Sequence, residues 1–500
     1  MCNLPRILVS FLFALFLLGT RSKAQEDHNH RAPEKLGTVT FSISCTAEVQ
    51  QPFERAVALL HSFAYADAEK AFRDVAERDS KCAMAHWGMA MTYFHQLWEP
   101  PLAPSAIANG QREMGVAQGL GATTERERKF IGALSVIYQD AGTVGYRARA
   151  TKYQHAMKDL AQNNRTDVET QAFYALALLA NASPTDKTHA HQKESADLLE
   201  PLFRAHPQHP GIPHYLIHAY DNAELARRGV PAARAYALIA PSTPHALHMP
   251  SHIFTRLGLW DDAIGSNAAA RHAAHQQGDI GEELHAMDYL VYAYLQSGRD
   301  SEAAQMVQQL SAMPDLRTED FKVAYASTAM PVRYAMERGE WAEAALIVPR
   351  EGSPPQVAAI AVWARGLGLA RTGHALEARR EAARLQQVES QLGTARSEYW
   401  SAQVGILVRE VLAWTAQADG KSQEAVTLMR EAADREDAME KLPVTPGPIL
   451  PAREQLGDLL LEQHQPDQAH KEFAAALADA PGRRRALQGA AHATELSSTK

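Results

Sequence analysis

The chain has 500 residues, of which 46% are hydrophobic and 22% are charged, and its formal net charge at pH 7 is −8. This length and composition exclude bulk disorder and exceed what one compact core supports, so several units or one repeat array are expected. A mildly acidic chain without a long basic run also excludes an electrostatic binding surface for nucleic acid or for an anionic membrane.

The first 24 residues predict a cleaved export signal. Arg6 precedes an apolar run over residues 7–19, and Ser22 and Ala24 are small residues at the two positions that a signal peptidase reads. The run is too short to span a bilayer, and no later stretch approaches the roughly 20 apolar residues of a span. Removing residues 1–24 changes the net charge from −8 to −11, because three basic residues and no acid leave. We expect an exported, periplasmic or secreted protein without a membrane span; an uncleaved anchor is the alternative.

Two cysteines remain after the signal is removed, Cys45 and Cys82. An even pair in an oxidising compartment predicts a disulfide. It would tie the segment before the first helix to the start of the second repeat. Two separate buried thiols are the other interpretation.

One turn recurs along the chain and ends, five residues later, in alanine. A glycine at its first position suits the left-handed residue that closes a helix, and the small alanine lets two helices approach closely. The regular copies cover residues 258–263, 298–303, 339–344, 373–378 and 420–425, and looser copies cover 63–68 and 464–469.

The spacing of these turns predicts a helical repeat array. Successive turn glycines lie between 34 and 47 residues apart, a period typical of helical-hairpin solenoids. The pattern of a glycine, an aromatic residue and an alanine resembles the tetratricopeptide-repeat (TPR) family. The resemblance implies an all-α, TPR-like solenoid, which can curl into a closed superhelix.

The repeats and the breaks between them predict eight segments. They are a signal peptide (1–24), an extended N-terminal arm (25–52), N-terminal helical repeats (53–200), a His/Pro-rich central segment (201–257), TPR-like repeats (258–440), a Pro-rich loop (441–452), a C-terminal TPR-like repeat (453–494) and a frayed tail (495–500).

Histidines concentrate in the central segment. Seven of the 22 lie between residues 206 and 252, where an even spread would place about two. The first cluster reads HPGIPHYLIHAYD over residues 209–221. Because Pro213 suits the first turn of a helix, His214, His218 and Asp221 are expected on one helical face.

The second cluster reads PHALHMPSHIF over residues 244–254. A helix is expected to begin near Pro250, which leaves His245 and His248 on the approach and His252 in the first turn. The next repeat adds His285 and Asp288, three residues apart on one helical face.

Metal binding is the sharpest hypothesis for these residues, because imidazoles from facing helices hold zinc, copper or iron. The expected ligands are His214, His218, His248 and His252. Further ligands, or residues that orient the ligands, are His209, Asp221, His245, His285 and Asp288. Two interpretations compete with a metal: hydrogen bonding around the proline-broken turns, and binding of an organic ligand.

Other residues are expected in structural roles. His61, His95 and Trp98 would face the histidine clusters in a tightly curled array, but they suit the edges of core helices better. The arginines near the C-terminus are expected to pair with acids between repeats: Arg453, Arg483, Arg484 and Arg485.

The early Leu-Leu-His61 helix, the two histidine strings and a late PAREQLGDLLL together resemble a group of exported bacterial TPR proteins of unassigned activity. This narrower resemblance implies fold and export and brings no chemistry. No HExxH or GxSxG string occurs, which excludes the standard zinc-protease helix and the hydrolase nucleophile elbow.

Two functions follow from the sequence. The first is an exported scaffold that binds a peptide or protein partner on a concave repeat surface. The second is a metalloprotein; as an enzyme, it would use the bound metal to activate water or to carry a redox step.

Overall fold

The computed structural model describes residues 33–97, 102–395 and 397–498, and within these residues it contains α-helices and two short 3₁₀ helices but no strand. The predicted all-α class is therefore confirmed. Residues from Lys35 onward form one compact unit. The signal predicted for residues 1–24 lies outside the described residues. No helix in the described part of the chain combines the length and the apolar character that a bilayer span requires.

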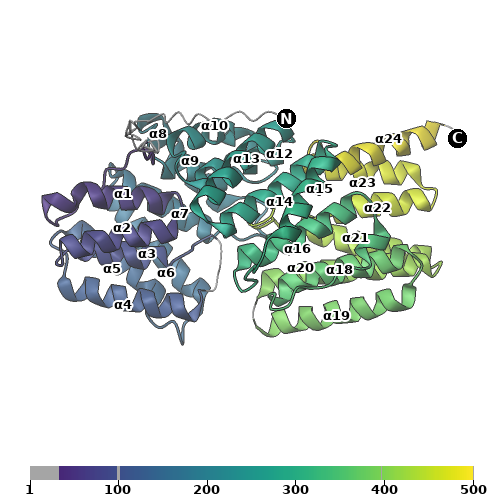
Figure 1. Ribbon diagram of the computed structural model, residues 1–500, viewed down its shortest axis with the longest axis horizontal. Coiled ribbons are helices and arrows are strands. Elements are labelled where there is room, and N and C mark those ends of the chain that lie inside the picture. The colour runs from purple at the N-terminus through teal and green to yellow at the C-terminus, as the bar shows by residue number, and fades with distance from the viewer. Residues whose placement is uncertain (1–32, 98–101, 396, 499–500) are drawn as a thin grey trace, which may run out of the picture. The chain divides into compact units, whose positions relative to one another are not determined.

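Consecutive helices pack side by side along the chain, coloured from purple to yellow in Figure 1. The first are η1 (Ala47–Val49), α1 (Gln50–His61), α2 (Tyr65–Arg78), α3 (Ala83–Thr92), α4 (Pro104–Leu120), α5 (Glu125–Tyr138), α6 (Tyr146–Asn163), α7 (Val168–Ala180) and α8 (Ala190–Ala205). The central helices are α9 (Gly211–Tyr220), η2 (Ala226–Gly229), α10 (Val230–Ile239), α11 (Pro244–His248) and α12 (Pro250–Arg256). The remaining helices are α13 (Trp260–Gln277), α14 (Ile280–Gln296), α15 (Asp300–Ala312), α16 (Phe321–Glu337), α17 (Trp341–Ala344), α18 (Pro355–Arg371), α19 (Ala375–Thr394), α20 (Glu398–Ala418), α21 (Ser422–Asp437), α22 (Ala452–Glu462), α23 (Pro466–Asp479) and α24 (Arg484–Ser498).

The recurring turn joins the two helices of each hairpin. Its glycine has a φ between 67° and 84° at all five regular positions, Gly258, Gly298, Gly339, Gly373 and Gly420. This is the left-handed region, which glycine enters without a steric penalty. The alanine five residues later is fully buried in every copy: Ala68, Ala263, Ala303, Ala344, Ala378, Ala425 and Ala469. The helical-hairpin, TPR-like construction is therefore confirmed, and the protein is a helical repeat scaffold.

The N-terminal segment is fastened to the first helices. Cys45 and Cys82 form the predicted disulfide, with Cα atoms 5.1 Å apart. Cys82 caps the start of α3, so the bond ties the segment before α1 to the second hairpin. Nearby, Phe41 is fully buried and its ring packs edge-on against Phe53 and Trp87.

Removing this disulfide is expected to lower the free energy of unfolding by about 2–4 kcal/mol, because a cross-link restricts the unfolded chain. The two cysteines are 37 residues apart, so the closed loop is long. Urea unfolding with and without a reductant measures the effect. The Cys45→Ser/Cys82→Ser variant is the control, whose midpoint the reductant should not move. Equal midpoints for oxidised and reduced wild-type protein would contradict the prediction.

Candidate metal centre

Six buried histidines come together from four helices. Within each of two groups of three, the atoms that can bind a metal lie within 4.8 Å of one another. The first triad is His214 and His218 of α9 with His245 of α11, and the second triad is His248 of α11, His252 of α12 and His285 of α14. None of the six exposes more than 9% of its surface.

Helices α11 and α12 differ from their prediction. The sequence analysis placed His245 and His248 on a loop that approaches a helix starting near Pro250. Helix α12 does begin at Pro250, but His245 and His248 already lie in α11. Met249 between the two helices has a φ of −52° and a ψ of −36°, which are helical values. Proline is tolerated in the first turn of a helix. Because α12 therefore continues from α11 without a break in helical backbone geometry, the histidines of the two helices share one face.

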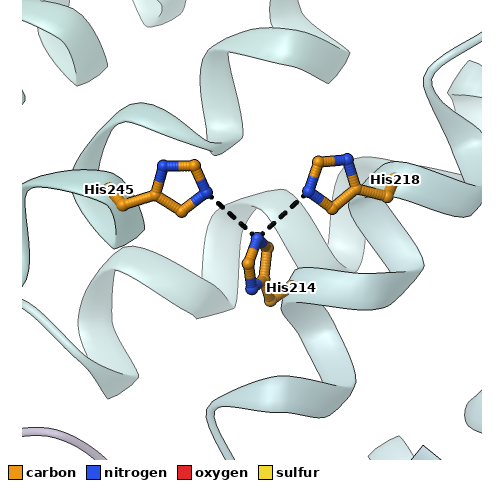
Figure 2. A group of neighbouring side chains, drawn as sticks. All are labelled: His214, His218 and His245. Carbon is orange, nitrogen blue, oxygen red and sulfur yellow. Dashed lines mark hydrogen bonds between the residues drawn. The ribbon is translucent and has the colours of Figure 1, made fainter. Parts of the chain in front are cut away.

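The first triad is arranged around Nε2 of His214. This atom lies 3.1 Å from Nε2 of His218 and 3.2 Å from Nε2 of His245, as Figure 2 shows. His214 and His218 are one turn apart on α9, which places both rings on one face. Nitrogens bound to one tetrahedral metal ion at about 2.0–2.1 Å lie about 3.3–3.4 Å apart. Both contacts of His214 are therefore close to the spacing of imidazole ligands on a single ion.

Contacts on the far side of two of these rings locate their N–H groups. Nδ1 of His214 lies 2.6 Å from the carbonyl oxygen of His61, and a carbonyl only accepts, so Nδ1 carries the hydrogen. Nδ1 of His245 faces a carboxylate oxygen of Glu282 at 3.5 Å. A neutral imidazole has one N–H, so Nε2 of each ring presents a lone pair to the other at 3.2 Å. Two facing lone pairs repel each other unless a cation lies between them.

A third buried group, His61, Glu169 and His209, has a different chemistry. Nε2 of His61 donates to one oxygen of Glu169 at 2.8 Å, and Nε2 of His209 donates to the other at 3.0 Å. Nitrogen meets oxygen in both contacts, so each is an ordinary hydrogen bond. Burial would raise the pKa of Glu169, but His209 and His61 hold that pKa below its ordinary value. The group positions the first triad, because the carbonyl of His61 holds His214.

The second triad repeats the arrangement of facing nitrogens. Nε2 of His248 lies 3.0 Å from Nε2 of His252. Nδ1 of His248 donates to Oδ1 of Asn267 at 2.6 Å, and the amide of Asn267 is fixed in this orientation because its Nδ2 donates to a backbone carbonyl. Nδ1 of His252 donates to Asp221 at 2.9 Å. Both Nε2 atoms therefore carry lone pairs. His285 completes the triad, with its ring centre 4.4 Å from that of His248.

Asp221 connects the second triad to two buried cations. Its carboxylate accepts hydrogen bonds from Nε of Arg256 at 2.9 Å and from Nζ of Lys441 at 2.6 Å, as well as from His252. Burial would raise the pKa of Asp221, but Lys441 and Arg256 hold it well below its ordinary value. The carboxylate stays charged and fixes the orientation of His252, the role that such partners have behind metal-bound histidines.

Burial favours the neutral form, which is the form that binds metals, at five of the six triad histidines. Burial lowers the pKa of His252 to about 4, although Asp221 acts in the opposite direction. Burial also holds the pKa well below its ordinary value at four further rings: His214, His218, His248 and His285.

Aromatic rings pack against both triads. The ring centre of Phe63 lies 4.4 Å from that of His214 and 5.4 Å from that of His245. Tyr289 lies between 4.7 and 5.2 Å from the three rings of the second triad, and its hydroxyl donates to the carbonyl of Pro443 at 3.2 Å. These apolar faces limit the access of water to the histidines.

The contact of Phe63 with the first triad was not predicted from the sequence. Phe63 occupies the turn position that glycine holds in the regular repeats, with a φ of 53°. A side chain in this left-handed conformation costs about 1–2 kcal/mol. His464 occupies the same position of the other looser copy, with a φ of 58°.

The structure places the remaining predicted site residues as follows. The four histidines predicted to share one site divide between the two triads. Asp288 pairs with Arg333 at 3.4 Å. His209 binds Glu169 rather than a triad. His61 is the last residue of α1, and its carbonyl accepts a hydrogen bond from His214.

Roles were also predicted for His95, Trp98 and the C-terminal arginines. The ring of His95 stacks on Tyr65, with centroids 4.2 Å apart. Trp98 lies outside the described residues. The C-terminal arginines pair with acids as predicted: Arg453 with Asp437, Arg483 with Glu337 and Glu454, Arg484 with Asp300 and Arg485 with Asp458.

A cavity of about 160 Å³ lies next to the partners of Asp221. Arg256 and Lys441 line it and also bind Asp221, so one carboxylate separates the cavity wall from His252. Part of the predicted Pro-rich loop lines the cavity as well, together with aromatic side chains: Tyr292, Tyr325, Trp363, Tyr399 and Trp400.

Stability is expected to fall as the pH rises because of Glu410 in the cavity wall. Burial, reinforced by the charge of Glu436, raises the pKa of Glu410 well above its ordinary value of 4.5. A carboxyl group with a raised folded-state pKa contributes stability below its unfolded pKa and loses it as the pH rises. Glu410→Gln should remove a slope of about 1.4 kcal/mol per pH unit above about pH 5. Urea midpoints measured from pH 5 to 8 test this, with exposed Glu398→Gln as the control; parallel curves for all three proteins would contradict it.

No protein-family model matches the chain, and no curated protein matches its sequence. Similar solved structures include the TPR domain of P58(IPK), at 13% identity over 91% of this chain and 99% of that chain, with a TM-score of 0.22. They also include yeast Tom70, at 10% identity over 90% of each chain, with a TM-score of 0.34. The Cut9–Hcn1 hetero-tetramer of the APC/C matches at 10% identity over 89% of each chain, with a TM-score of 0.30. Scores this low carry no argument about function, and the fold assignment rests on the hairpins themselves.

Proposed function

We propose that this protein binds a transition-metal ion through its buried histidine triads. One observation carries the proposal: imidazole nitrogens meet Nε2 to Nε2 at 3.0–3.2 Å in both triads. In each triad, two of these rings turn Nδ1 toward an oxygen, which leaves lone pairs facing each other. A metal cation between them replaces this repulsion with coordination bonds.

The donor set indicates the class of metal. The ligand atoms of each triad are imidazole nitrogens, with no carboxylate or thiolate among them. Imidazole suits zinc, copper, iron and nickel, whereas magnesium and calcium prefer oxygen ligands. Three histidines leave one coordination position open, which is the arrangement of catalytic rather than structural zinc sites. A metal ion bound by one triad would therefore have a coordination position for a further ligand.

Metal binding can be tested by titration of the full chain. The protein, prepared without a metal-affinity tag and stripped with a chelator, is titrated with zinc in competition with a chromophoric chelator. We expect at least one tightly bound ion per chain, and one ion fewer in a His214→Gln/His218→Gln/His245→Gln variant. The matched control removes three exposed histidines, His155, His206 and His492, and should keep the ion. Wild-type protein that binds no ion, or a control that loses it, would refute the proposal.

We also propose that the chain is exported and that its repeat array binds a peptide or protein partner. The charged start and apolar run of residues 1–24 support export, and so does the Cys45–Cys82 disulfide, since disulfides persist in oxidising compartments. The aromatic cavity supports partner binding, because it has the apolar lining that a partner side chain requires. N-terminal sequencing of secreted protein should show a start at Gln25. Protein that keeps Met1 and stays in the cytoplasm would contradict export.

Partner binding has its own test. Proteins that co-purify with the full chain from the exported fraction are compared between the wild type and a Trp400→Ala variant, which changes one aromatic wall of the cavity. We expect a partner that is lost in the variant. The same partner recovered equally with both proteins would contradict a role for the cavity.

A further inference from the structure

We propose that the two triads hold two copper ions at the same time, as one binuclear centre. The inference rests on the proposed function, and adds to it the number of ions, their proximity and their identity.

The six histidines are built as two sites rather than one. Their nitrogens satisfy the distance criterion of a common ion only within each group of three. The two triads are also constructed alike. Each contains two histidines four residues apart on one helical face, His214 with His218 and His248 with His252, whose Nε2 atoms lie 3.1 and 3.0 Å apart. Each is completed by one histidine from a further helix. Aromatic rings pack against both triads, Phe63 and Tyr236 on the first and Tyr289 on the second.

The two sites are immediate neighbours. The ring centre of His218 in the first triad lies 6.0 Å from that of His252 in the second. A second contact joins the triads through His245 and His248, whose ring centres are 6.2 Å apart. These two residues are one turn apart on α11, so the helix fixes the distance between the sites. The rings of both pairs are in direct contact, so ions in the two triads would interact directly.

The donor set favours copper. The candidate ligand atoms of both triads are imidazole nitrogens. Among the divalent first-row metals, copper binds nitrogen ligands most strongly.

Copper content and electron paramagnetic resonance (EPR) together test the inference. The full chain is stripped, loaded with Cu(II) and freed of excess copper by gel filtration, and its total copper is compared with its EPR-visible copper. We expect two copper ions per chain and an EPR signal smaller than the total copper, because unpaired electrons on adjacent ions couple. His218→Gln and His285→Gln each disrupt one triad. Each variant should bind one copper, all of it EPR-visible, while exposed His206→Gln should behave as the wild type.

The outcomes separate this inference from the proposed function. One copper per wild-type chain, or two copper ions with a full EPR signal, would overturn the binuclear centre and leave metal binding intact. No bound copper or zinc would overturn both. Circular dichroism checks that each variant is folded. If a variant does not fold, the ratio of EPR-visible to total copper in the wild type still decides the question.

Discussion

Replacing His214 by alanine is expected to lower the affinity of the first triad for its metal by more than about 100-fold. Loss of a residue that only orients a metal ligand costs about 10–100-fold, and His214 is itself the ligand whose Nε2 faces both of its partners. Two imidazoles would remain. A competition titration with a chromophoric chelator gives the affinity directly.

The same substitution should alter the response of stability to metal. A ligand present at about 100 times its dissociation constant stabilises the folded state by about 2.7 kcal/mol. Metal should therefore raise the thermal midpoint of wild-type protein by more than that of His214→Ala. His206→Ala serves as the control, because His206 is exposed and lies in the same segment. Equal metal-induced shifts in the wild type and His214→Ala would refute a ligand role for His214.

Asp221→Asn is expected to lower the free energy of unfolding by about 3–5 kcal/mol, the usual cost of removing one partner from a buried ion pair. Asp221 balances Arg256 and Lys441, and all three side chains are at most 8% exposed. The neutral amide would remove the carboxylate that both buried cations share and leave Arg256 with the more distant Glu440, at 3.5 Å. It would also release the ring of His252, so metal binding at the second triad should weaken. Urea unfolding and the copper titration measure the two effects separately.

The pH dependence of the wild type gives an independent check on Asp221. Lys441 and Arg256 outweigh burial and hold the pKa of Asp221 well below its ordinary value of 3.8. A group with a depressed folded-state pKa contributes its full stability above its unfolded pKa and loses it as the pH falls. Asp221→Asn should therefore lose less stability than the wild type below about pH 4. Exposed Asp159→Asn is the matched control, and an equal loss of stability in the wild type and Asp221→Asn would contradict this role.

The repeat architecture was readable from the sequence because it depends on local chemistry. Gly258 and Ala263 show why: one takes a left-handed φ of 67° and the other is fully buried against a neighbouring helix. Both requirements are satisfied by residue type within a few positions of the chain. The disulfide was predictable for a similar reason, since only Cys45 and Cys82 remained to pair.

The grouping of the histidines could not be read from the sequence, because it depends on long-range packing. His61 is far from His214 in the chain, and its contribution is a backbone carbonyl, which residue type does not reveal. The prediction that His245 and His248 lie on a loop before Pro250 failed for another reason. Proline ends most helices, but in a first turn it is compatible with a helix that continues almost directly from the preceding one. His245 and His248 both lie in α11 and belong to different triads.

The anomalous scattering of crystals grown from metal-loaded protein tests the central claim most directly. Data collected on either side of the absorption edge of the metal locate the ion without reference to any assumed ligand. We expect a peak about 2 Å from the Nε2 atoms of His214, His218 and His245. Crystals of fully loaded protein whose anomalous peaks all lie away from both triads would contradict the claim that these histidines form a metal centre.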